Sequence, residues 1–531
     1  MAVLAFAASQ GPSTFADAGT PPSIVVMAKA LDDLISLDPA EAFELSGAEI
    51  VANLYQRLFE PNPDNPAEPV PALVERWRLD PDGRRYLFTL RQGVRFASGA
   101  PVRAEDAVFS LARVVRLNKT PAFLLTQLGL SAETVDQRLQ VIDDRQFALT
   151  TDRDYAPSFV LNVLSAGVAS VVEKRAALAH ARSGDLGHSW LRRNAAGAGA
   201  FGLRAWKPGE YVMLDSNPSY WRGAPILARV ILRDIREPAT QRLMLERGDI
   251  DIARNLAADQ IAALADNPDL QIWRIERARL TYLGLNQRHP ALAEPLVRRA
   301  MRYLIDYQGI AERLLKGRAR VHQSFLPAGL AGALDQTPFA PDLAQARALL
   351  AEAGWQNGFR ASLDLRADAQ TLLVAQALQA SMAEAGIALE IVPGEGKQTL
   401  TRYRARHHDI VLGQWDPDYL DPHSNAAAFA RNPDNRDDGA DKTLAWRNAW
   451  AIPEITAITD RALLERDPAK RAALYRDLQE ILQGDSPFII LFQDFELIAA
   501  RRTVEGFRAG VSADQTYYRG LSKQAAASDR Q

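Results

Sequence analysis

Residues 361–392 read ASLDLRADAQTLLVAQALQASMAEAGIALEIV: a short apolar run, a longer helical pattern and a second apolar run. The first run predicts a strand that ends at Arg366, and residues 370–385 predict a helix that Gly386 ends. Residues 387–392 predict a second strand. A strand, a helix and a strand in this order are typical of a βαβ unit with parallel strands. The stretch therefore predicts an α/β fold.

The same alternation extends on both sides of this stretch. Residues 342–353 predict a helix ended by Gly354, residues 398–406 another helix, and residues 409–415 a third strand. In open α/β sheets, ligands bind outside the carboxyl ends of the strands, where the winding reverses. One predicted strand ends at Arg366 and another at Trp415, so we expect a ligand site where these ends meet.

Three glycines, Gly197, Gly199 and Gly202, have the spacing of a dinucleotide-binding loop. Such a loop needs a strand before it and a helix that begins inside it. The residues that follow instead predict a β-hairpin, with strands over 201–206 and 211–215. Because no helix N-terminus would face a pyrophosphate, dinucleotide binding is not predicted. We interpret the glycines as a backbone requirement of a tight corner.

Composition narrows the functional class. With 531 residues and 47% hydrophobic content, the chain can bury several cores. Its 62 Lys and Arg against 65 Asp and Glu give a net charge of −3, so no nucleic-acid partner is expected. The absence of cysteine excludes disulfides, thiolate zinc sites and a cysteine nucleophile, and is compatible with an oxidising compartment. No apolar run is long enough to predict a membrane span.

The two ends of the chain differ from the rest. Residues 1–18 are apolar and rich in alanine and end in Ala16-Asp-Ala18, which resembles the second half of a secretory signal without its basic start. A flexible alanine-rich tail is the alternative. From Gly520 onward the chain is poor in large apolar residues, and we expect disorder there.

Several motifs resemble the family 5 extracellular solute-binding proteins, the receptors of dipeptide, oligopeptide and nickel ABC importers. They are VANLYQRLFE (51–60), GAGAF (197–201) with WKPGEY (206–211), NPSYWRGAP (217–225) and WDPDYLDP (415–422). The resemblance runs from about residue 23 to 520. Ala198 and Ala200 depart from the family pattern, which has Thr or Ser and Pro at these positions.

The resemblance implies an α/β, two-lobed periplasmic-binding-protein-like fold (type II, cluster C) with an extra N-terminal α+β subdomain. The implied division gives lobe I residues 19–48, 175–275 and 489–525, the extra subdomain residues 49–174, and lobe II residues 276–488. Residues 1–18 are then the signal-like segment and 526–531 a disordered tail. The lobes are expected to close on a ligand about a hinge near 270–280 and 488.

The implied function is that of a periplasmic, monomeric receptor that captures a small peptide or peptide-like solute and delivers it to an ABC permease. No enzymatic activity, cofactor or metal is expected. Two alternatives stay open: the same receptor binding an opine, a sugar or a metal complex, and a hydrolytic enzyme, which turnover would reveal.

The resemblance places the family's ammonium-binding aspartate on Asp418, although a solvated loop carboxylate is the alternative. Asp416 and Tyr419 share its motif and are further candidates, Asp416 a weaker one. In the oligopeptide receptors an arginine stands three positions before the tryptophan, where this chain has Leu412, so the oligopeptide pattern is incomplete.

The remaining candidates rest on side-chain chemistry. Arg366 could bind a ligand carboxylate with two hydrogen bonds, or lie on the surface. Tyr55 and Trp415 could stack on a ligand or belong to the core. Asn286 and Gln287 could bond a peptide backbone or form a turn.

One short motif raises the question of a metal. His407 and His408 are adjacent and precede Asp409. Because neighbours in a strand point to opposite faces, the two histidines cannot both bind one ion without a bend, and no metal site is predicted.

Overall fold

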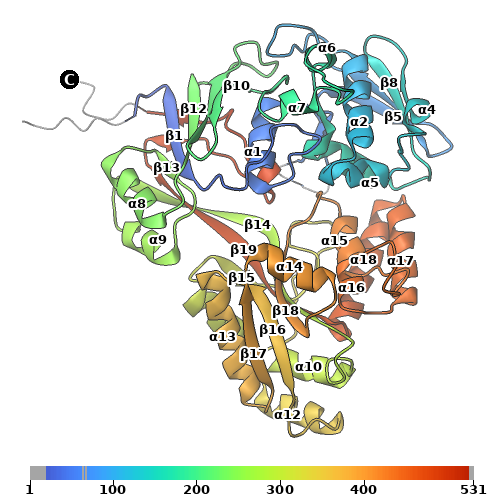
Figure 1. Cartoon of the computed structure of the whole chain (residues 1–531), viewed down its shortest axis with the longest axis vertical. Helices are drawn as coiled ribbons and strands as arrows, with labels where there is room; N and C mark the ends of the chain where they lie inside the picture. Colours follow the sequence, from blue (N-terminus) through green and yellow to red (C-terminus); the bar gives the residue numbers. More distant parts are fainter. Residues whose placement is uncertain (1–19, 63–64, 66–67, 525–531) are drawn as a thin grey trace, which may run out of the picture.

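The computed structural model of the chain describes residues 20–62, 65 and 68–524 (Figure 1). The signal-like segment predicted over 1–18 and the tail predicted over 526–531 lie outside the described residues. Predicted disorder from Gly520 onward is wrong for residues 520–524. Leu521 is fully buried, and β21 (Ser522–Lys523) pairs antiparallel with β20 (Val504–Glu505). Burial of this one leucine in the nearby core anchors the segment.

One mixed sheet of 11 strands runs through the whole molecule, in the order β10-β11-β12-β1-β13-β19-β14-β18-β16-β17, with β15 paired to β19 (Figure 1). We call the described residues before β14 and after β19 the upper half, and those between them the lower half. The upper half contributes β1 (Ile24–Lys29), β10 (Phe201–Lys207), β11 (Tyr211–Ser216), β12 (Arg229–Asp234) and β13 (Ile252–Ala253). The lower half contributes β15 (Ala319–Val321), β16 (Arg360–Arg366), β17 (Ala388–Gly394) and β18 (Ile410–Trp415).

The predicted alternation of helices and strands in the lower half is confirmed. After α12 (Leu343–Glu352), the chain runs through β16, α13 (Ala369–Ala383), β17, α14 (Gly396–Arg404) and β18. Gly354 and Gly386, at φ +78° and +84°, take the left-handed conformation that ends helices. β16 lies between β17 and β18 and is parallel to both, so the winding reverses at the carboxyl ends of β16 and β18.

Two long strands connect the halves: β14 (Leu270–Leu285) and β19 (Phe488–Arg501). They pair antiparallel along their length, from Leu270 opposite Arg501 to Gly284 opposite Phe488. Their register shifts between Glu276 and Leu280, which face Phe495 and Gln493. A second shift lies between Thr281 and Tyr282, so regular pairing is interrupted over residues 276–282 of β14, between the two halves.

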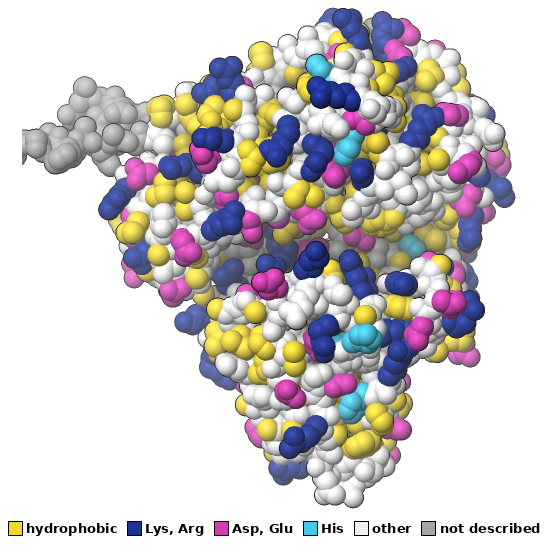
Figure 2. All heavy atoms as spheres, in the orientation of Figure 1, with side chains coloured by type: hydrophobic (Ala, Val, Ile, Leu, Met, Phe, Trp, Pro, Cys, Tyr) yellow, Lys and Arg dark blue, Asp and Glu magenta, His cyan; other side chains and the backbone are white. Residues whose placement is uncertain are grey.

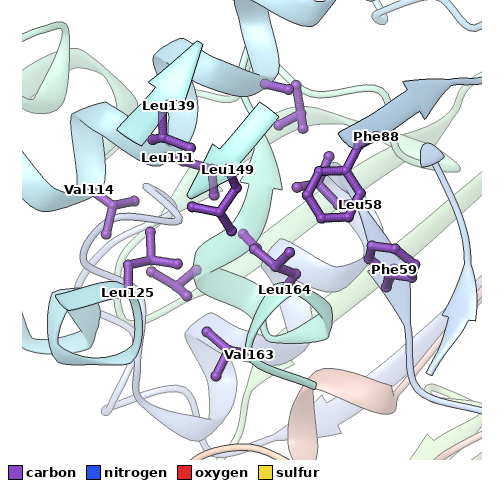
Figure 3. Packing of buried hydrophobic residues seen from close by; sticks show 14 of the residues in the cluster. Leu58, Phe59, Phe88, Leu111, Val114, Leu125, Leu139, Leu149, Val163 and Leu164 are labelled. Carbon is purple, nitrogen blue, oxygen red and sulfur yellow. The ribbon is translucent and has the colours of Figure 1, made fainter. Parts of the chain in front are cut away.

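A separate core fills the part of the upper half between residues 58 and 171 (Figure 3). Phe88 lies at its centre, with ring centroids 5.1 Å from Phe147 and 5.9 Å from Phe59. Figure 3 shows Leu111 of the long helix and Leu164 of a second helix directed into the same cluster. The elements around it are β5 (Val74–Leu79), β6 (Arg85–Leu90), β7 (Leu139–Val141), β8 (Gln146–Thr150), α2 (Ala104–Leu117) and α5 (Pro157–Ser165).

The hairpin of β10 and β11 is confirmed, and the structure shows why glycines precede it. A Cβ on Gly197 would lie 2.1 Å from the carbonyl oxygen of Leu54, and one on Gly199 would lie 2.3 Å from that of Asn53. Both carbonyls belong to the last turn of α1 (Leu45–Leu54). Neither glycine adopts a positive φ. The requirement is therefore close approach of two backbones and not a turn conformation.

The other elements complete the two halves. The lower half adds α10 (Pro295–Tyr303), α11 (Tyr307–Gly309), a π-helical turn (Ile310–Leu314), α15 (Pro422–Phe429), α16 (Leu444–Arg447), α17 (Pro453–Leu464) and α18 (Pro468–Gly484). The upper half adds β2 (Gln56–Arg57), β3 (Phe59–Glu60), β4 (Val70–Pro71), β9 (Ser170–Val171), α3 (Phe123–Thr126), α4 (Val135–Arg138), α6 (Lys174–Ala179), α7 (His188–Leu191), α8 (Pro238–Arg247), α9 (Ala258–Leu264) and three 3-10 turns (Thr120–Ala122, Gly167–Ala169, Ala513–Gln515). Across the part of the chain that the structure describes, no helix has both the length and the apolar character of a membrane span.

Candidate ligand-binding site

A cavity of about 640 Å³ lies at the carboxyl ends of β16 and β18, where the topology predicts a ligand. Figure 2 shows this face of the molecule hollowed between the two halves, with Lys and Arg side chains around the hollow. The lower half supplies one wall, mainly from β18 and α14. Phe43, Thr120 and Phe123 of the upper half line the other wall, and Thr281 and Asp494 of the crossing strands also line it. Its volume is in the range of small-molecule sites in proteins.

Asp418 lies in this cavity, three residues after the end of β18. Its backbone N–H donates to Oγ of Ser424 at 2.9 Å, which fixes the loop. Its carboxylate has no hydrogen-bond or ion-pair partner among the described residues. Burial, and secondly the charge of Asp416, raise the pKa of Asp418 to about 7, while Arg447 opposes the rise. The ionised form of such a carboxyl is stabilised when a cation approaches it.

Trp415 and Arg366 line the same cavity, so the structure brings both together with Asp418. Trp415 Nε1 donates to Oδ1 of Asn425 at 3.2 Å, which holds the indole in place at the end of β18. Arg366 is the exposed last residue of β16 and lies over the start of α14, since a Cβ on Gly396 would be 3.6 Å from its Nε.

Asp416 lies in a neighbouring cavity of about 200 Å³ and forms an ion pair with Arg279 at 2.9 Å. Tyr419 is buried outside the larger cavity: its ring packs 5.8 Å from that of Phe159, and its hydroxyl donates to Gln127 at 3.4 Å. Neither residue lines the larger cavity.

Three further candidates lie in the protein interior and do not line the cavity. Tyr55 belongs to the core of the upper half, where its hydroxyl accepts from the N–H of Ala196 at 3.4 Å. The Asn286 amide donates to the carbonyl oxygens of Arg406 and His408, at 3.2 and 2.8 Å. The Gln287 amide donates to carbonyl oxygens of its own loop. These side chains hold the backbone that surrounds them.

The two adjacent histidines point to opposite sides, as expected of neighbours in an extended chain. His407 is exposed, whereas His408 is buried and its Nε2 lies 3.1 Å from Oδ1 of Asn448. Among the described residues, no group of three or more His, Cys, Asp and Glu side chains is arranged to hold a metal ion.

The sequence reasoning missed four charged residues of the cavity: Asp368, Arg404, Arg447 and Asp494. Burial raises the pKa of Asp494 to about 7, although Arg279 opposes the rise. Arg404 falls on a helix that the sequence does predict, next to the predicted site. Arg447 ends the four-residue α16, and Asp494 lies inside β19, so no local pattern marks either one.

The cavity also has an apolar side. Phe43 and Phe123 line it and contact each other edge to face, with ring centroids 5.9 Å apart. Carboxyls, guanidinium groups and aromatic rings therefore surround one space. This combination can bind a small zwitterion that carries an apolar part.

Comparison with known proteins identifies the same family as the sequence motifs. The chain matches the family described as bacterial extracellular solute-binding proteins, family 5 Middle, over residues 68–437. It is 28% identical over 510 residues to the probable D,D-dipeptide-binding periplasmic protein DdpA of Escherichia coli (strain K12), covering 94% of each chain. It is 26% identical over 533 residues to di/tripeptide-binding protein 2 of Pseudomonas aeruginosa (strain UCBPP-PA14), covering 95% of each.

Solved structures confirm the predicted fold. The periplasmic binding protein DppA from Helicobacter pylori, in complex with peptide STSA, aligns with a TM-score of 0.79 at 24% identity, over 94% of this chain and 98% of that chain. The substrate-binding protein CtaP from Listeria monocytogenes aligns with a TM-score of 0.82 at 19% identity, over 94% and 99%. The α/β fold is thus the two-lobed fold of periplasmic binding proteins. The chain belongs to the family 5 bacterial extracellular solute-binding proteins and is a solute receptor, not an enzyme.

Proposed function

We propose that this protein is a periplasmic receptor that captures a small peptide or peptide-like solute and delivers it to an ABC permease. The observation that carries the proposal is the partner-free carboxylate of Asp418 in a cavity that also contains arginines and aromatic rings. The relatives named as binding dipeptides and tripeptides cover nearly the whole chain and support a ligand of this class.

The proposal assigns the two ends of the ligand to opposite charges. Asp418 binds the ammonium, because an ammonium restores the charge partner that this buried carboxyl lacks. Trp415 contacts the ligand beside it. The carboxylate faces the arginines of the wall, Arg366 among them, since a guanidinium can donate two parallel hydrogen bonds to it.

The lobes predicted from the sequence are part of the proposal. The hydrophobic clusters support them: one gathers mainly residues between 58 and 171, with Tyr419 of the lower half packed into it, and another gathers residues of the lower half. The receptor acts as a monomer, and its ligand is enclosed between the lobes and released to the permease in the membrane.

Titration calorimetry with alanyl-alanine tests the role of Asp418, using the L,L and D,D forms and their N-acetylated derivatives. Asp418→Asn keeps the shape of the side chain and removes its charge. We expect it to weaken binding of the free-amine dipeptide by about 2–5 kcal/mol, or roughly 30-fold to several thousand-fold. The acetylated peptides should bind poorly to both proteins.

Asp144→Asn is the matched control. Its carboxyl is 80% exposed and pairs with Arg103 far from the cavity, so affinity should change less than about twofold. Mass spectrometry of the peptide after incubation should recover it intact, because a receptor does not turn over its ligand. Equal affinities of Asp418→Asn and the wild type would remove Asp418 from the site and favour a ligand without a free amine.

A further inference from the structure

Two arginines of the cavity wall, Arg404 and Arg447, have no anionic partner. Both side chains line the cavity, and neither makes an ion pair or a side-chain hydrogen bond with any residue that the structure describes. The Nε of Arg447 is shielded from solvent and has no hydrogen-bond partner among those residues. A shielded N–H without an acceptor costs free energy, and an acceptor on a bound ligand would remove that cost.

Arg404 is exposed and Arg447 is half-buried, whereas the fully buried arginines show how this protein usually satisfies a guanidinium. Arg113 pairs with Asp38, Arg254 with Glu49 and Arg471 with Asp421, at 2.5, 2.7 and 2.6 Å. Arg302, which is buried without a carboxylate, donates to carbonyl oxygens of the backbone instead. Arg404 and Arg447 differ from these residues, and both open into the cavity.

The positive charges of Arg404 and Arg447 act on each other at this wall. The pKa of Arg404 is lowered, first by partial burial and then by the positive charge of Arg447. Repulsion between two cations destabilises the empty site, and an anion bound between them removes that repulsion.

Arg447 is held in position by a buried support. Its guanidinium carbon lies 5.3 Å from the ring centroid of Tyr403, the residue next to Arg404. The Tyr403 hydroxyl accepts from the side-chain amide of Asn448 at 2.9 Å, and both residues are buried. A guanidinium fixed in this way loses little freedom when it binds an anion.

We propose that Arg404 and Arg447 together form the subsite that binds the carboxylate of the ligand, a role that the sequence had suggested for Arg366. The inference rests on the proposed function, that of a receptor for a zwitterionic peptide. It also limits the ligand's length. Arg447 and Asp418 line the same cavity of about 640 Å³, so the ammonium and carboxylate subsites share one space, of a size that suits a small peptide.

The test compares alanyl-alanine with its C-terminal amide by titration calorimetry. The wild type should prefer the free acid by at least about 30-fold, because the amide carries no charge for the arginines. Arg447→Gln and Arg404→Gln should each reduce this preference to below about fivefold, with little effect on the amide. Arg436→Gln, whose side chain is 74% exposed and pairs with Asp434 outside the cavity, is the matched control and should keep the preference. A preference that survives in Arg447→Gln and Arg404→Gln, or that is lost only in Arg366→Gln, overturns the inference.

A second experiment tests the carboxylate subsite independently of which ligand the protein binds. Acetate at high concentration should raise the melting temperature of the wild type and of Arg436→Gln relative to chloride, but not that of Arg447→Gln or Arg404→Gln. If no dipeptide binds and this acetate pattern holds, the peptide proposal fails while the carboxylate subsite stands. If acetate stabilises all four proteins equally, the subsite is wrong whether or not dipeptides bind. Thermal unfolding in chloride shows whether each variant is folded. If one of the two arginine variants is not folded, the result for the other variant tests the inference.

Discussion

At the residue scale, the charge state of Asp418 makes ligand binding depend on pH. Because the pKa of Asp418 is about 7, half of its carboxyls are ionised at pH 7 and about one in a hundred at pH 5. The ammonium and carboxylate of a dipeptide stay charged over this range. Only the ionised form of Asp418 pairs with the ammonium, so affinity should fall as the pH falls. We expect a loss of roughly 10- to 50-fold between pH 7 and pH 5 by calorimetry.

The sign of the proton change gives an independent check. Ligand binding selects ionised Asp418, so near pH 6 it should release protons, which calorimetry in buffers of different ionisation enthalpy measures. Asp418→Asn should bind weakly and almost independently of pH. Because the pKa of Asp494 is also about 7, Asp494→Asn is the informative comparison. If it abolishes the pH dependence while Asp418→Asn retains it, Asp494 is the group that binds the ammonium.

At the scale of elements, the contact between α1 and the start of β10 depends on glycine. The N–H of Gly199 donates to the carbonyl oxygen of Leu54 at 3.1 Å, and a methyl group at position 199 would overlap the α1 backbone. Gly199→Ala should therefore lower the free energy of unfolding by about 1–3 kcal/mol in urea titrations. Gly202→Ala is the control, since a Cβ there meets no atom within 4 Å, and it should be nearly neutral. Equal losses in both variants would contradict close approach as the reason for Gly199.

The elements predicted well from the sequence are those with local signals. Gly354 and Gly386 each signal the end of a helix by a single residue, and the apolar runs nearby define the strands. The strand ends then identify Arg366, Trp415 and Asp418, all of which line the cavity.

The residues that escaped prediction depend on contacts between distant parts of the chain. Arg447 reaches the cavity only because the short helix α16 packs beside α15, and its cap, Thr443, signals a helix start but not a direction. Asp494 interrupts a strand whose pattern indicates burial alone. The sequence leaves open whether Tyr55 stacks on a ligand or belongs to the core, because a tyrosine ring suits both places, and the structure shows it in the core beside Ala196. Such distinctions require the packed structure.

At the scale of the whole molecule, the crossing strands locate the bending point. The sequence suggests a hinge near residues 270–280 and 488. Pairing is regular at 488, and the register shifts lie between Glu276 and Leu280 and between Thr281 and Tyr282, opposite residues 490–495. A ladder without regular hydrogen bonds at one level bends there most easily, so we expect the halves to rotate about this level.

Several contacts join the two halves and would change when the halves move apart. The N–H of Ala156 donates to the carbonyl oxygen of Leu463 at 3.2 Å, and Arg471 donates to Ser158 at 3.1 Å, so both pairs join the upper half to the lower half beside the cavity. The ring of Tyr419 also packs on Phe159 of the upper half, and we expect these contacts to change as the ligand enters and leaves.

The natural chain has no cysteine, so pairs of spin labels can be introduced without removing any residue. Asp144→Cys and Asp438→Cys, each with a side chain about 80% exposed, place one label on each half. The distance between them should become shorter and narrower in distribution when alanyl-alanine is added. Asp144→Cys with Arg78→Cys, whose side chain is 70% exposed, keeps both labels on the upper half and should give an unchanged distance. Because a closing hinge moves one half against the other, an identical distribution for the cross-half pair with and without bound ligand would contradict the hinge, and a change in the control pair would place the movement inside the upper half.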